Sequence, residues 1–110
     1  MYMEEIYIEG FCARPFRKMD VDDMFIIICM RKGKSTAKVS KLLKIDPSCI
    51  LKRVRKIDRL LPELFMMKET EGYKKTGEWW ATKRFLTEKG VAFADACETF
   101  LKKIATYPHF

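Results

Sequence analysis

The chain of 110 residues has 22 Lys or Arg against 15 Asp or Glu, which gives a formal net charge of +7. This length favours one domain with a single hydrophobic core, and a content of 48% hydrophobic residues is too high for a disordered polar chain. No apolar run is long enough to span a bilayer, and the start of the chain, with Glu4 and Glu5, is unlike a signal peptide. We therefore expect a single cytoplasmic domain over residues 1–110, without a membrane partner.

Residues 1–18 are predicted to form a short strand and a connector. The β propensity of residues 3–8 predicts the strand, and Gly10 marks its end. Residues 14–18, which include Pro15, should form a basic connector to the helical part of the chain.

The segment 19–86 is predicted to begin with a largely buried helix. Asp20 is a typical N-cap residue, and the carboxylates of Asp22 and Asp23 in the first turn favour the positive end of the helix dipole. The helix should end near Gly33. Its apolar positions are Met24, Phe25, Ile27, Ile28 and Cys29.

A second, shorter helix should follow. Ser35 or Thr36 can serve as its N-cap, and Lys38 and Lys41 occupy its polar face. Its inward-facing residues are Val39, Leu42 and Leu43.

The third helix is predicted over residues 46–60. Asp46 followed by Pro47 is a strong start signal, because proline at the first helical position loses no hydrogen bond. The residue before Pro62 is pushed away from helical geometry, which ends the helix. Its inward positions are Ile50, Val54, Ile57 and Leu61, and its outward positions are Ser48, Leu51, Lys52, Arg55, Lys56 and Arg59.

Two short strands and a long helix complete the predicted fold. Residues 64–67 and 79–86 would be the strands, and with the polar loop between them they would make a wing. Thr87 is expected to cap the last helix, which occupies the segment 87–106 and runs to about Ala105. The predicted fold class is therefore mainly α with a small β wing.

The positive charge is concentrated between residues 31 and 60. This window contains eleven Lys or Arg and two acidic residues, a balance of +9, so that the rest of the chain sums to −2. A basic pair of helices joined by a tight turn is typical of a surface that binds nucleic-acid phosphates. The alternative is a solvated lysine-rich surface that has no ligand.

No catalytic or metal-binding pattern accompanies this charge. The four cysteines, at positions 12, 29, 49 and 97, form no Cys-x-x-Cys pair, and the only histidine is His109. The sequence has no phosphate-binding glycine loop and no paired carboxylates on a shared face. We therefore expect buried reduced thiols, no metal, no cofactor and no enzymatic activity.

The order of these elements resembles the winged helix-turn-helix domains of LysR-type regulators and of the molybdate-responsive regulator ModE. Ser35 opens the second helix as a serine does in the LysR pattern, and Leu86, Thr87 and Gly90 match the Leu-Thr-x-x-Gly that opens its last helix. Further matches are the apolar residues Leu43, Ile45, Ile50, Val54 and Ile57 and the pair Leu64 and Phe65 before the wing. The N-terminal strand and the long wing loop are more similar to ModE.

The chain also departs from both families. Val39 and Ser40 replace the alanine pair of the second LysR helix, and Leu51 stands where LysR recognition helices often have serine. The wing is charged and aromatic where that of ModE is rich in glycine. These residues include neither the effector domain of LysR-type regulators nor the molybdate-binding domains of ModE, so we do not expect molybdate or metabolite sensing.

The resemblance and the charge together imply sequence-specific binding of double-stranded DNA by a dimeric transcriptional regulator. Helix 46–60 would read the major groove, and the wing would contact the backbone or the minor groove. The expected DNA-binding residues are Ser35, Thr36, Lys38, Pro47, Ser48, Leu51, Lys52, Arg55, Lys56, Arg59, Lys74, Lys75, Lys83 and Arg84. The last helix would supply the homodimer interface, through Phe93, Cys97, Phe100 and Ile104.

Three alternatives remain open. The apolar residues of the last helix could instead fold back onto the first helix as core. The winged helix could be a protein-interaction module or a subunit of a larger complex, a use that leaves the basic third helix without a purpose. RNA binding is disfavoured, because the deep, narrow groove of A-form RNA rejects a helix.

Overall fold

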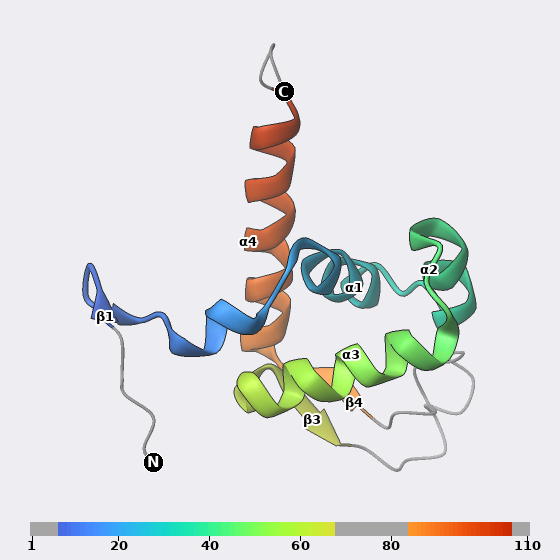
Figure 1. The fold of residues 1–110 in the computed structure, drawn as a ribbon, viewed down its shortest axis with the longest axis horizontal. Helices are drawn as coiled ribbons and strands as arrows, with labels where there is room; N and C mark the ends of the chain where they lie inside the picture. Colours follow the sequence, from blue (N-terminus) through green and yellow to red (C-terminus); the bar gives the residue numbers. More distant parts are fainter. Residues whose placement is uncertain (1–6, 68–83, 107–110) are drawn as a thin grey trace.

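A computed structural model describes residues 7–67 and 84–106. Most of these residues lie in four α-helices, α1 (Val21–Arg31), α2 (Thr36–Leu43), α3 (Pro47–Leu60) and α4 (Glu88–Ala105), accompanied by two small antiparallel sheets (Figure 1). The prediction of a mainly α fold is confirmed. The predicted wing loop and residues 79–83 of its second strand lie outside the described residues. Within the two described ranges, no helix is both long enough and apolar enough to cross a membrane.

The N-terminal region forms a small hairpin followed by a short 3-10 helix. Strand β1 (Tyr7–Ile8) pairs antiparallel with β2 (Phe11–Cys12). Glu9 and Gly10 between them both have positive φ, of 50° and 90°, as a tight hairpin turn requires. The sequence predicted the strand before Gly10, but it did not predict β2. The basic connector is the 3-10 helix η1 (Arg14–Lys18).

Side-chain caps fix the starts of α1 and α2. The carboxylate of Asp20 accepts a hydrogen bond from the amide of Asp23, and the Asp23 carboxylate accepts one from the amide of Asp20 in return. Of the two predicted caps of α2, Ser35 is the one observed, and its hydroxyl oxygen accepts from the amide of Lys38 at 3.1 Å.

The starts of α3 and α4 also agree with the sequence. Asp46 caps α3 through the amide of Ser48 at 2.9 Å, and Thr87 caps α4 through the amide of Gly90 at 3.1 Å. Between α2 and α3 the chain turns at Lys44, which has a left-handed conformation with φ 58° and ψ 44°. This turn packs α2 against α3.

The hydrophobic core lies between α1, α2, α3 and the first half of α4, with Leu64 and Phe65 also contributing. Ile26 and Ile27 of α1 and Val39 of α2 have no solvent exposure. The four predicted inward positions on and after α3 are all buried: Ile50, Val54, Ile57 and Leu61. The apolar stripe of α3 therefore faces the core, and the rest of that helix is available to solvent or to neighbouring elements.

Two predicted core positions are wrong. Phe25 is 38% exposed, because the buried stripe of α1 passes through Asp23, Ile26 and Ile27 instead. Leu42 is 55% exposed, because the inward face of α2 is taken by Thr36 and Val39 together with the partly buried Leu43.

The second sheet holds the start of α4 in place. Strand β3 (Phe65–Met67), which follows the short 3-10 helix η2 (Pro62–Leu64), pairs antiparallel with β4 (Arg84–Leu86). The amide of Thr87 donates to the Leu64 carbonyl at 3.0 Å. A Cβ atom on Gly90 would lie only 2.3 Å from the same carbonyl oxygen, so this position requires glycine.

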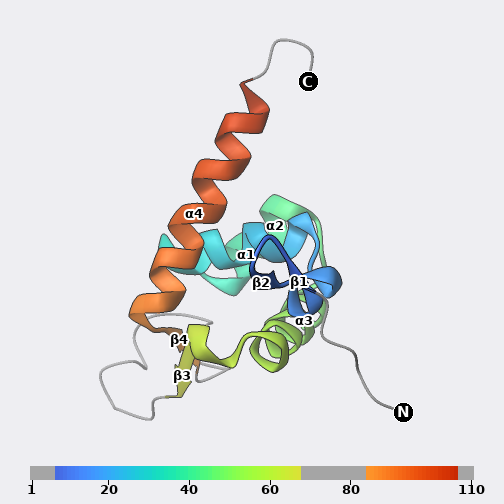
Figure 2. The same ribbon diagram turned by 90° about the vertical axis from the view of Figure 1, so that its left-hand side faces the viewer.

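Helix α4 packs across α1 and then extends beyond the rest of the protein (Figures 1 and 2). Two ion pairs fasten the crossing. Arg31 Nε lies 3.3 Å from Asp95 Oδ1, and Lys32 Nζ lies 3.1 Å from Glu98 Oε2. Hydrogen bonds from Lys102 and Lys32 lower the pKa of Glu98. The C-terminal end of α4 stands clear of the other described helices in both views.

This packing corrects half of the predicted dimer interface. Cys97 is buried at 5% exposure, and Phe93 packs against the core, with its ring 6.5 Å from that of Phe16. For these two residues the alternative, that they fold back as core, is the one observed. Phe100 is 52% exposed and Ile104 is half-buried, and both lie on the extending part of the helix.

None of the four cysteines is joined in a disulfide, but they are not all buried as predicted. Cys29 and Cys97 are buried, and burial raises the pKa of both, for Cys97 to about 11, so they remain protonated at neutral pH. Cys12 is half-buried. The prediction is wrong for Cys49, which is exposed because it lies beside, and not within, the buried stripe of α3.

Candidate nucleic-acid interface

Three basic residues of α3 face away from the core and form a surface that we call the outer row: Lys52, Arg55 and Arg59. All three are exposed, and none has a carboxylate partner within the described residues. They are spaced by three and four residues, so they follow one face of the helix over about 10 Å. The outer row therefore presents three positive charges along one line that no carboxylate of the described ranges offsets.

The N-terminal turn of α3 extends this face with polar and apolar groups. Pro47 and Ser48 are exposed, as predicted, and Leu51 is half-buried. The Ser48 hydroxyl donates to Asp46 Oδ1 at 2.6 Å, and this bond together with the Ser48 amide lowers the pKa of Asp46. The Ser48 hydroxyl is therefore engaged in the helix cap. Cys49 belongs to the same turn and is exposed, although it was predicted to be buried.

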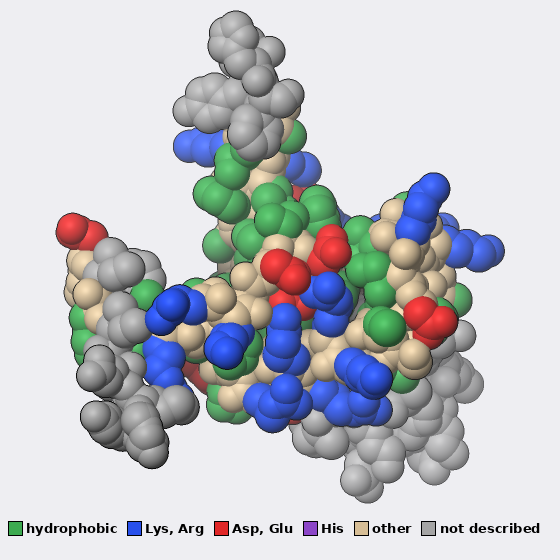
Figure 3. All heavy atoms as spheres, viewed as in Figure 1, with side chains coloured by type: hydrophobic (Ala, Val, Ile, Leu, Met, Phe, Trp, Pro, Cys, Tyr) green, Lys and Arg blue, Asp and Glu red, His purple; other side chains and the backbone are tan. Residues whose placement is uncertain are grey.

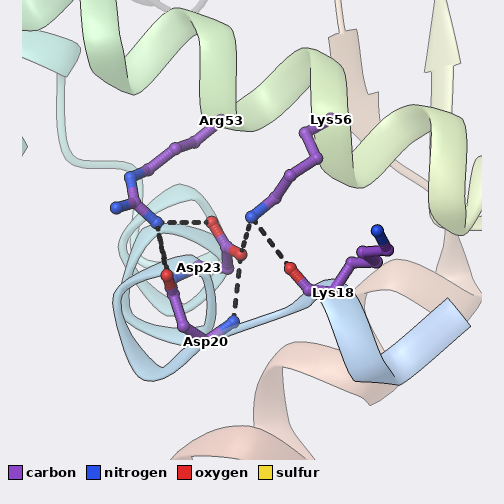
Figure 4. A network of polar contacts seen from close by, with 5 residues as sticks. All are labelled: Lys18, Asp20, Asp23, Arg53 and Lys56. Atoms are coloured by element: carbon purple, nitrogen blue, oxygen red, sulfur yellow. Dashed lines mark hydrogen bonds and ion pairs between the residues drawn. The ribbon is translucent and has the colours of Figure 1, made fainter.

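The other two cations of α3, Arg53 and Lys56, lie on the flank of the helix that faces the start of α1 (Figure 4). Arg53 Nη1 lies 2.9 Å and 3.0 Å from the two carboxylate oxygens of Asp20 and 3.1 Å from Asp23 Oδ1. Lys56 Nζ lies 2.6 Å from Asp23 Oδ2 and donates to the Lys18 carbonyl at 3.1 Å. Two cations and two carboxylates thus form one neutral cluster, which we call the aspartate clamp.

The aspartate clamp holds Lys56, one of the residues predicted to contact DNA. Lys56 was expected to contact DNA with the outward-facing residues, but its ammonium is held by Asp23, whose side chain has no solvent exposure. Arg53, which sequence reasoning missed, is the second cation held in this way. The signal that could have revealed it is the pairing of two aspartates at one helix start with two cations three residues apart on another helix.

The aspartate clamp changes the pKa of the Asp20 carboxyl. Desolvation opposes ionisation of this carboxyl, but the hydrogen bonds from Arg53 and the Asp23 amide, with the charges of Arg53 and Lys56, outweigh it and lower the pKa of Asp20. Reciprocally, the hydrogen bond with Asp20 raises the pKa of Arg53. Asp20 and Arg53 are therefore both ionised at neutral pH.

The start of α2 contributes fewer side chains to the candidate DNA-binding surface than predicted. Lys38 is exposed, but Ser35 already uses its hydroxyl oxygen as the helix cap. Thr36 is only 3% exposed, and its hydroxyl has no hydrogen-bond partner in the part of the chain described. Its side chain is turned to the core and does not reach the surface, which corrects its predicted phosphate contact. Ser35, Ala37, Lys38, Lys41 and Leu42 line a shallow hollow of about 300 Å³ on this helix.

The predicted wing contacts cannot be placed on this surface. Lys74, Lys75 and Lys83 lie outside the described residues. Arg84 is the first residue of β4, where its backbone pairs with that of Met67.

Taken as a whole, this face of the molecule is basic. Figure 3 shows Lys and Arg side chains gathered over α3, with acidic side chains beside them toward α1. In the described ranges, no three His, Cys, Asp or Glu side chains gather in a way that could hold a metal ion. The chemistry that the surface offers is donation of charged hydrogen bonds to an anion.

Comparisons of the chain with protein-family models, with curated proteins and with solved structures return no match.

Proposed function

We propose that this protein is a winged helix-turn-helix domain that binds double-stranded DNA sequence-specifically and acts as a transcriptional regulator. In this proposal α3 enters the major groove, which is wide enough for a helix. Lys52 and Arg55 donate to base edges, with guanine O6 and N7 as the preferred acceptors, while Leu51 contacts a thymine methyl group. Arg59, Lys38 and the amides at the start of α2 bind phosphates.

The observation that supports this proposal most strongly is the contrast between the two sides of α3. Ile50, Val54 and Ile57 have no exposure, whereas the outer row on the opposite side is exposed and has no carboxylate partner among residues 7–67 and 84–106. Surface cations normally lie among carboxylates that offset their charge. In this protein Arg53 and Lys56 are offset in this way, by the carboxylates of the aspartate clamp. A rigid helix that presents three cations along one line is suited to a polyanion with regularly spaced charges.

We further propose that two copies bind together through the extending part of α4. A single domain of this size covers a short DNA site, and specific binders of this kind usually pair on two half-sites. Because Phe93 and Cys97 belong to the core, the contact would centre on Phe100 and Ile104. Sedimentation at high micromolar concentration tests this part of the proposal: a monomer would contradict it.

Selection of bound sites from a random duplex library tests the proposal for DNA binding. The expected result is enrichment of a short motif, present as two half-sites if the protein is dimeric. Recovery of the library without enrichment would contradict sequence specificity, and absence of any binding would contradict the proposal as a whole.

One observation favours a second candidate, a protein-interaction module. Leu42 and Phe100 are more than half exposed, and side chains of this kind supply apolar contacts to a partner protein. Specific capture of an acidic protein partner, together with absent duplex binding, would support this second function and contradict the first.

A further inference from the structure

The aspartate clamp sits at the edge of the proposed DNA surface, and its two cations belong to the helix that is proposed to enter the groove. Lys56 is four residues after Lys52 and three before Arg59, so it neighbours the outer row on the helix surface. Arg53 lies farther round the same flank, toward α1. The clamp thus withholds two of the five cations of α3 from solvent anions.

The dimensions of the major groove would bring this flank of α3 close to DNA phosphates. The major groove is about 12 Å wide, and a helix with its side chains is about 10–12 Å across. A helix in the groove therefore has base edges in front of it and a phosphate backbone along each flank. A long cationic side chain on the flank of α3 is within the region that phosphates would occupy.

The two carboxylates differ in how firmly they hold their cations. Asp23 has no exposure, and Lys56 has a second partner in the Lys18 carbonyl. The Asp20 side chain, by contrast, is 55% exposed, and it contacts only one nitrogen of the Arg53 guanidinium, which is itself 28% exposed. The same nitrogen has one further contact, with Asp23 Oδ1 at 3.1 Å, so Asp20 supplies two of its three carboxylate contacts. Exposed pairs of this kind contribute little net stability, so a phosphate can exchange for a carboxylate at low cost.

We infer that Asp20 competes with DNA phosphate for Arg53 and so limits the strength of sequence-independent binding by this protein. In the free protein Asp20 holds Arg53, and on DNA a phosphate oxygen has to replace the carboxylate. Because a phosphate contact carries no sequence information, Asp20 would weaken binding to every duplex by a similar factor, and the base contacts of the outer row would not depend on it. This inference rests on the proposed function and concerns the regulation of the same surface.

The test measures the affinity of the full chain for a short fluorescein-labelled duplex of random sequence, by anisotropy over a series of salt concentrations. In Asp20→Asn the charge is lost but the N-cap is kept, since Asn and Asp are equally good caps. Release of one cation should steepen the slope of log affinity against log salt by about 0.9 and tighten binding roughly fivefold to tenfold at about 0.1 M salt. Asp20→Ser, a second neutral cap, should behave in the same way.

Asp22→Asn is the matched control. Asp22 lies in the same first turn of α1 and has no ion-pair partner in the described structure, so its substitution changes the net charge equally but releases no cation. It should leave the slope unchanged. In the double variant Asp20→Asn with Arg53→Gln, the gain should disappear, because the released cation is no longer present.

The possible outcomes separate this inference from the proposed function. If the wild-type chain binds the duplex in a salt-dependent manner and Asp20→Asn has the slope and affinity of Asp22→Asn, the inference is wrong and the proposed function stands. The same conclusion follows if the double variant keeps the gain. If the wild-type chain binds no duplex, both are wrong.

Discussion

Replacement of Asp23 by asparagine should destabilise this protein more than any other single loss of charge in the first turn of α1. Asp23 is fully buried and uses its two carboxylate oxygens for three partners: the Asp20 amide, Arg53 and Lys56. Asparagine has one oxygen and one NH2 group. In either orientation of the amide, one of the two cations faces a donor instead of an acceptor.

The size of this effect can be worked out from the geometry. Removal of one partner from a buried ion pair typically costs about 3–5 kcal/mol. Arg53 and Lys56 each retain 28% exposure, and Arg53 keeps its contacts with Asp20, so water and Asp20 compensate in part. We therefore expect Asp23→Asn to lower the free energy of unfolding by about 2–3 kcal/mol. For a domain of about this length, that corresponds to a fall in Tm of roughly 8–12 °C.

Thermal and urea unfolding followed by circular dichroism measure this loss, with Asp22→Asn as the control. Asp22 also lies in the first turn but has no ion-pair partner within the described residues, so its variant should lose only the interaction with the helix dipole, about 0.3–1 kcal/mol. If Asp23→Asn and Asp22→Asn unfolded at the same temperature, Asp23 would not be the buried counter-charge that holds α3 to α1.

Three further predictions concern other parts of the fold and the surface. Gly90→Ala should destabilise the protein by about 1–3 kcal/mol although alanine favours helices, because the new Cβ would lie 2.3 Å from the Leu64 carbonyl oxygen; urea unfolding measures this, and a more stable variant would contradict it. Arg55→Ala should cost about 1–3 kcal/mol at one base position of a selected site and relax the preference there, so an unchanged selection profile would refute a base contact. Acid should weaken the protein through Asp20: its folded pKa is below the ordinary value of 3.8, so its contribution is complete above that pH and is lost as the pH falls through the lower folded value. Unfolding curves of the wild type and of Asp20→Asn should therefore converge below about pH 4, and a constant difference would contradict this.

Helix limits and the inward face of α3 could be predicted from the sequence because they depend on local chemistry. Asp20, Asp46 and Thr87 are caps whose partners lie within three residues, so no knowledge of the tertiary structure is needed. The periodic apolar residues of α3 determine which side is buried, whatever the neighbouring helix is.

The pairing of surface charges could not be predicted, because it depends on how distant helices are placed. Arg55 and Lys56 are adjacent basic residues of one helix. Lys56 forms an ion pair with the buried Asp23 of α1, whereas Arg55 is exposed. Phe93 likewise has the spacing of an interface residue, and only the crossing of α4 over α1 turns it into core. Thr36 was predicted at the surface and is buried for the same reason.

The salt dependence of duplex binding tests the central claim most directly. If the outer row contacts DNA, log affinity should fall linearly with log salt, and with six to eight phosphates neutralised the slope should be roughly −5 to −7. Replacement of Lys52, Arg55 and Arg59 by glutamine should make the slope less steep by about 1, because Arg59 is the phosphate contact among them, and should also remove the base contacts while the protein remains folded. Binding that does not respond to salt, or a triple variant with the slope of the wild type, would contradict the claim that this face of α3 meets DNA.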